Sequence, residues 1–257
     1  MPDAPPKASR ATCWMAPCAF LGVYVALLAL TSLTVADHAR RAGWPADEMA
    51  PRATLALVIV ETVGISVGVP FFFASCRERV GPRAAVGRVL APAVALVAAG
   101  FVACAATARG GVPLAAIAWA HAFLLAFALF LASLTAFLAR VGLRPATAQL
   151  VASALALAMV GSVLYANPAV EAAKGERART LVINAVLWTS PWAIAAGSIL
   201  QADPIRFEHL YSWSVIKYYS FSYPGARIGS VALRSAAVSG VYLGAALALL
   251  ALRRWRR

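Results

Sequence analysis

Long apolar segments follow one another along almost the whole chain, and each is close to the length of one bilayer crossing. Hydrophobic residues make up 62% of the 257 residues and charged residues only 13%, whereas soluble proteins average about 45–50% and about 25%. A helix needs roughly 20 apolar residues to cross the hydrocarbon core. The sequence therefore predicts an all-α, polytopic membrane helix bundle, with residues 1–257 forming a single integral membrane domain.

Hydropathy divides the chain into seven apolar segments. They cover approximately residues 13–36, 54–73, 89–106, 114–138, 146–166, 181–200 and 235–252. The first is too long for the apolar core of a signal peptide, so we expect an uncleaved first span. The polar stretch at residues 37–53 is long enough for a short interfacial helix.

The sixth segment differs from the others because Asn184 and the run Trp188–Trp192, which contains Pro191, lie inside it. Proline removes a helical hydrogen bond and kinks a helix, and indole rings prefer the head-group interface to the bilayer centre. We therefore expect six transmembrane helices plus one re-entrant or broken segment, with seven crossings as the alternative. Six crossings with a cytoplasmic N-terminus place the basic residues 253–257 in the cytoplasm, which the positive-inside tendency favours.

The net charge of +13 comes from Lys and Arg residues that flank the apolar segments. Such residues meet the anionic head groups of the lipid bilayer, and they form no continuous basic stripe of the kind that binds nucleic acid. The excess of Ala, and of Arg over Lys, is typical of a GC-rich bacterial genome. We therefore expect a multi-pass protein of the bacterial inner (cytoplasmic) membrane that does not bind nucleic acid.

Aromatic side chains are concentrated between the last two apolar segments, beside charged residues. This interfacial aromatic segment includes Tyr211, Trp213, Tyr218, Tyr219 and Tyr223. Aromatic rings beside charge favour the plane of the membrane interface. Two interpretations remain open: simple anchoring, and a lid or entry surface for an amphiphilic substrate.

Glu61 and His121 are the ionisable residues deepest within the predicted spans. Intramembrane charges are costly, so they usually face the bundle interior and pair. The second and fourth spans run in the same direction, and each residue is eight positions into its span, so the two lie at similar depth. They predict an ion pair or a proton relay. The alternative is a neutral histidine, with a glutamate that reaches toward water or bonds to the backbone.

Motifs of soluble enzymes are missing from the sequence. There is no HExxH, no useful pair of carboxylates, no Ser/His/Asp arrangement and no GxxxxGK(S/T) phosphate loop. The four cysteines, Cys13, Cys18, Cys76 and Cys104, show no CxxC spacing and are interpreted as small buried apolar residues. We therefore expect a protein that is not an enzyme, with no catalytic residue, no metal site and no cofactor bound by this chain.

Two glycine pairs have the spacing that lets membrane helices approach closely. They are Gly64 with Gly68, and Gly240 with Gly244. They predict close helix contact or dimerisation and carry no chemistry.

The end of the second span reads Pro-Phe-Phe-Phe-Ala-Ser-Cys-Arg-Glu-Arg, from Pro70 to Arg79. Together with six spans and an aromatic, partly re-entrant stretch at residues 181–224, it resembles the membrane subunits of ABC transporters of the ABC-2 type. In that family a proline and an apolar run precede a cytoplasmic Glu-Arg element, and an external helical hairpin precedes the last span. Here only residues 80–88 separate the Glu-Arg element from the third span, fewer than the family usually has.

The resemblance implies a permease subunit of an ABC-type exporter, with ATP bound by a separate ATP-binding subunit. Glu78 and Arg79 would face that subunit, with Arg77 and Arg83 nearby. It also implies a homodimer or heterodimer of permeases joined through the first, second and fifth spans. Competing hypotheses are a non-transporting membrane scaffold or assembly factor, a membrane-embedded enzyme, and a proton-coupled carrier that uses Glu61 and His121.

Overall fold

The computed structural model describes residues 10–75, 82–108, 111–200 and 228–252. Within these ranges the chain forms eight helices. In chain order they are α1 (Arg10–Ala42), α2 (Ala46–Ser75), α3 (Pro82–Thr107), α4 (Leu114–Arg140), α5 (Pro145–Ala172), α6 (Glu176–Thr189), α7 (Pro191–Leu200) and α9 (Ile228–Leu252).

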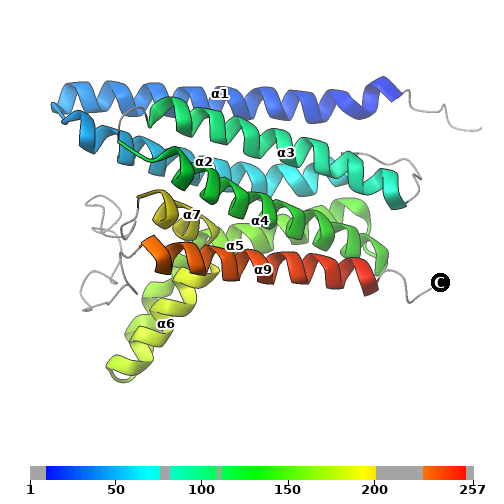
Figure 1. The fold of residues 1–257 in the computed structure, drawn as a ribbon. Helices are drawn as coiled ribbons and strands as arrows, with labels where there is room; N and C mark the ends of the chain where they lie inside the picture. The colour runs from blue at the N-terminus through cyan, green and yellow to red at the C-terminus, as the bar shows by residue number, and fades with distance from the viewer. Residues whose placement is uncertain (1–9, 76–81, 109–110, 201–227, 253–257) are drawn as a thin grey trace, which may run out of the picture.

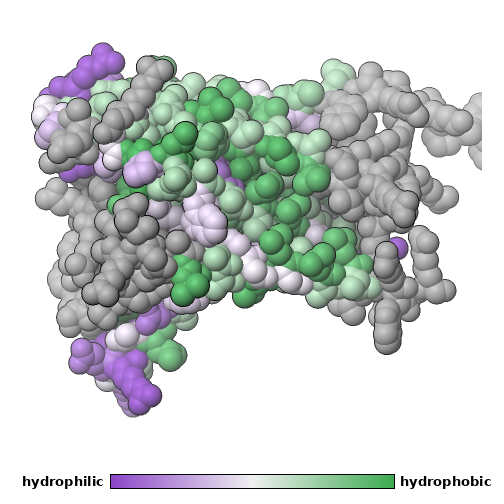
Figure 2. All heavy atoms as spheres, viewed as in Figure 1, coloured by the Kyte–Doolittle hydropathy of each residue, from purple (hydrophilic) through white to green (hydrophobic). Residues whose placement is uncertain are grey.

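Five of these helices, α1 to α5, contain apolar stretches long enough to cross a membrane. They coincide with the first five predicted segments, while α9 contains the last one and has an apolar core at Ser235–Ala251. The long helices lie side by side along one direction (Figure 1). Apolar residues cover much of the middle of the visible face, and strongly hydrophilic residues gather at one end of it (Figure 2). The chain is therefore a multi-pass membrane protein.

The connection between α1 and α2 is much shorter than the polar stretch predicted at residues 37–53. Only Gly43, Trp44 and Pro45 separate the two helices. Gly43 has φ +65°, and the Trp44 amide donates to the Ala39 carbonyl at 3.0 Å, an arrangement typical of a helix that ends at a glycine. α1 continues past its apolar span because no residue before Gly43 ends the helix.

The sixth predicted segment forms a bent pair of helices. α6 and α7 meet at an angle of 86°, at Ser190 and next to Pro191, which confirms the predicted break. α5 ends and α9 begins at the same end of the bundle, so the α6–α7 pair starts and finishes at that end (Figure 1).

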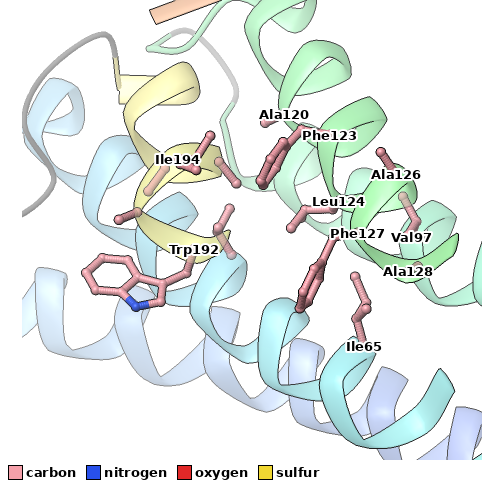
Figure 3. Close-up of a cluster of buried hydrophobic side chains, with 14 of the residues drawn as sticks. Ile65, Val97, Ala120, Phe123, Leu124, Ala126, Phe127, Ala128, Trp192 and Ile194 are labelled. Atoms are coloured by element: carbon pink, nitrogen blue, oxygen red, sulfur yellow. The ribbon is translucent and has the colours of Figure 1, made fainter. Parts of the chain in front are cut away.

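The core lies where α7 packs against α2, α4 and α9. Every residue of Pro191–Ile199 is buried, and Trp192 and Ile194 of α7 lie across from Phe123, Leu124 and Phe127 of α4 (Figure 3). Trp192 is only 6% exposed, and its Nε1–H donates to the Val160 carbonyl of α5 at 2.9 Å. Protein therefore surrounds the polar edge of this indole within the bent pair.

The first glycine pair allows α1 to pack closely against α2. A Cβ added to Gly64 would lie 2.5 Å from the Tyr24 ring, and one added to Gly68 would lie 2.5 Å from the Phe20 ring. The pair Gly240 and Gly244 is different, because no atom beyond the neighbouring backbone of the same helix lies within 4 Å of an added Cβ at either position. Its helix face is open toward lipid or another chain.

Candidate functional site

Three neighbouring helices each contribute one ionisable side chain to a single buried cluster. Glu61 comes from α2, Cys104 from α3 and His121 from α4. One carboxylate oxygen, the thiol sulfur and one imidazole nitrogen lie within 4.8 Å of one another. Glu61 and Cys104 are fully buried, and His121 is 4% exposed. Because ionisable groups are rare in the membrane interior and usually functional, we take this cluster as the candidate site.

The structure brings Glu61 and His121 into direct contact. His121 Nε2 lies 3.0 Å from Glu61 Oε2. Both groups come from central helices, and their equal depth in two spans of the same direction is what places them together. Neither Glu61 oxygen, nor His121 Nε2, has a hydrogen bond of good geometry within the described residues. The contact is therefore an electrostatic one between two buried side chains.

The orientation of the His121 ring is fixed from its other side. Nδ1 lies 2.7 Å from the Ile117 carbonyl, one turn earlier in α4. A carbonyl only accepts, so Nδ1 carries the proton and donates it. The edge of the ring also meets Phe101 of α3, with ring centroids 5.4 Å apart. These two contacts aim Nε2 at the carboxylate.

Small residues make room for the Glu61 carboxylate. A methyl group added to Gly100 of α3 would overlap the carboxylate carbon and both oxygens. On the α1 side, the Tyr24 ring fills the space above Gly64. The Tyr24 hydroxyl is buried without a hydrogen-bond partner among the described residues. Four helices thus surround one polar centre.

Most of the other predicted site residues lie outside the part of the chain that the structure describes. Arg83 falls in the first turn of α3. The residues outside the described ranges are the coupling candidates Arg77, Glu78 and Arg79 and the interfacial aromatic residues Tyr211, Trp213, Tyr218, Tyr219 and Tyr223. Among the predicted site residues that the structure describes, Glu61 and His121 are brought together.

Cys104 is the member of the site that sequence reasoning missed. Without a CxxC spacing it was interpreted as a small apolar residue, and its burial agrees with that interpretation. The signal that was available is its position: Cys104 lies near the end of the third span, which runs antiparallel to the second and fourth. It therefore comes close to the depth of Glu61 and His121.

Comparison with known proteins adds nothing to this description. No protein-family description, no curated protein and no solved structure matches the chain. The function must therefore be inferred from the residues and their geometry.

Proposed function

We propose that this chain is the permease subunit of a bacterial ABC-type exporter in the inner membrane, working with a separate ATPase chain. The observation that carries the proposal is the bent pair α6–α7. It stands between the fifth long helix and the last helix, and both its ends lie at one end of the bundle (Figure 1). This arrangement supports six crossings plus one re-entrant pair, which is the plan of ABC-2 permeases.

The position of α7 suits a gate. Irregular backbone at membrane depth is tolerated only where protein or water covers it, and α7 is covered by α2, α4, α5 and α9. The bend at Ser190 and Pro191 is a place where the pair can hinge, because the backbone of Ser190 is extended (φ −82°, ψ 109°) and not helical. Movement of α7 away from its neighbours would open the centre of the bundle at that end.

The coupling candidates Arg77, Glu78 and Arg79 fall in the sequence between α2 and α3, and the described ends of these two helices lie at the opposite end of the bundle (Figure 1). α2 ends at Ser75 and α3 begins at Pro82, far from α6–α7 in Figure 1. α2 also contacts α7 directly, so it can carry a movement from the one end to the other. An ATPase bound near Glu78 would therefore act on the gate through α2, and ATP would bind to that partner and not to this chain.

The outer faces of α1 and α5 offer room for a second permease. Large apolar side chains on both helices are exposed. On α1 they include Val23, Leu27, Leu30 and Leu33, and on α5 they include Leu150, Val151 and Leu155. Lipid would cover these faces in a monomer, and the partner permease would cover part of them in a homodimer or heterodimer.

Affinity purification from membranes in mild detergent, followed by mass spectrometry, tests the proposal. We expect stoichiometric recovery of a nucleotide-binding ATPase, and its loss on Glu78→Ala. Glu171→Ala is the matched control, because Glu171 is an exposed glutamate near the end of α5, at the α6–α7 end of the bundle. Recovery of the chain alone, from membranes in which another ABC complex stays intact, would refute the permease and favour a scaffold or assembly factor.

A second candidate function is a proton-coupled carrier, and the Glu61–His121 contact at 3.0 Å favours it. Such a carrier would need no ATPase, and proton binding at the pair would drive the transport step. We then expect Glu61→Gln to abolish proton-coupled transport in vesicles while the protein stays folded. Unchanged transport in this variant would exclude the carrier.

A further inference from the structure

We propose that Glu61, Cys104 and His121 bind a divalent transition-metal ion of the zinc class, which ties α2, α3 and α4 together inside the membrane. The proposal goes beyond the exporter function and does not depend on it.

The donor set is the one that such ions prefer. Zinc sites in proteins use cysteine sulfur, imidazole nitrogen and carboxylate oxygen, usually in a tetrahedron. Bonds of about 2.0–2.3 Å place tetrahedral ligands about 3.3–3.6 Å apart. The three donor atoms here all lie within 4.8 Å of one another, so small side-chain adjustments complete the geometry. Magnesium and calcium are disfavoured, because they take oxygen ligands.

The tautomer of His121 also points to a cation. Because Nδ1–H donates to the Ile117 carbonyl, a neutral His121 presents a bare lone pair at Nε2. That lone pair faces Glu61 Oε2 at 3.0 Å, so two acceptors oppose each other unless a positive charge lies between them. Histidine ligands of metals commonly donate their other N–H to a backbone carbonyl in this way.

A metal ion and a shared proton both give a cluster of zero net charge, and they differ in what happens to Cys104. One proton between His121 and Glu61 balances the Glu61 carboxylate and leaves Cys104 a neutral thiol, although its sulfur lies within 4.8 Å of the other two donor atoms. A divalent ion would neutralise both the Glu61 carboxylate and a Cys104 thiolate, which gives a net charge of zero where burial makes any residual charge costly. Binding would release the thiol proton of Cys104 to the solvent.

The surroundings of the cluster fit a site that is loaded once and then closed. Glu61, Cys104 and His121 are all buried, so an ion enters while the helices assemble and leaves only when they separate. The Tyr24 ring packs against Gly64 of α2, and its hydroxyl is a further buried oxygen without a partner among the described residues. We therefore expect the ion to resist removal by a chelator in the folded protein and to be released on unfolding.

The experiment measures metal by mass spectrometry in the full-length protein, purified in detergent and treated with EDTA. We expect about one zinc ion per chain in the wild type, and at least about tenfold less in Cys104→Ala and in His121→Gln. Cys18→Ala is the matched control, because Cys18 is an exposed cysteine on α1, and it should keep the full metal content.

Cobalt gives a second readout, which also deals with variants that fold poorly. Protein produced with Co²⁺ in place of zinc should show the absorption of a thiolate–cobalt bond, and Cys104→Ser should lose that band while it elutes as a single species in size exclusion. Zinc below about one tenth of an ion per wild-type chain, or cobalt bound without the thiolate band, would overturn the proposal. In the first case the positive charge is a proton shared by Glu61 and His121.

Discussion

Trp192 is the side chain whose loss should release α7 from the bundle. It is 6% exposed, and its indole N–H donates to the Val160 carbonyl of α5. An aromatic side chain buries about 150–250 Å², and an unrelaxed cavity costs about 20 cal/mol per Å² of its surface. Trp192→Ala should therefore destabilise the packed position of α7 by about 3–5 kcal/mol.

The assay reads the opening of α7 locally. Ser198 is a buried residue of α7, and Ser198→Cys places a thiol there that a maleimide reaches only when α7 moves away. The parent protein replaces the other cysteines by alanine except for the buried Cys104, whose background labelling is measured without Ser198→Cys. Since 1.4 kcal/mol is a factor of ten in an equilibrium constant, Trp192→Ala should speed labelling roughly 100- to 4,000-fold.

Trp119→Ala is the matched control. Trp119 lies on α4 and is 44% exposed, and lipid can fill the space that it leaves. A surface substitution of this kind changes stability by about 0.5 kcal/mol, so labelling should change less than about threefold. A ratio between the two variants below about ten would show that α7 is not held by the packing of Trp192, and the reasoning on the gate would fail.

Two glycine substitutions test the close contacts around the buried site. Gly100→Ala should push the Glu61 carboxylate out of its place. Breaking a buried charge pair costs about 3–5 kcal/mol, so the free energy of unfolding should fall by that amount. A melting temperature equal to that of the wild type would contradict this. Gly64→Ala should cost about 1–3 kcal/mol, because its methyl group meets the Tyr24 ring. Gly240→Ala has open space and should gain only the roughly 0.8–1 kcal/mol by which alanine favours a helix interior over glycine. It serves as the control for both melting measurements.

The helices could be predicted from the sequence because a bilayer sets the length of an apolar run. Five long helices and the break at Pro191 follow from hydropathy and proline chemistry alone. The ends of the helices could not be predicted in this way. Polar residues beyond the hydrocarbon core neither stop a helix nor extend it, so α1 continues to the glycine at position 43.

The candidate site could be predicted only in part. Glu61 and His121 are charged residues in apolar spans, so each stands out, and equal depth suggests their contact. Cys104 and Gly100 do not stand out, because cysteine and glycine are common among buried residues. Their importance depends on how α3 is rotated against α2 and α4, and that rotation is set by the packing of many side chains at once.

The burial of α7 has a consequence for the biosynthesis of the protein. α7 is only ten residues long, too short to cross a bilayer, and two of the helices that cover it, α2 and α9, are made before and after it. During synthesis it leaves the ribosome before α9 exists, so its final place is not yet complete. α7 must therefore stay at the membrane surface, or in a cavity that α9 does not yet cover, and it reaches its final position only after the C-terminal helix is inserted.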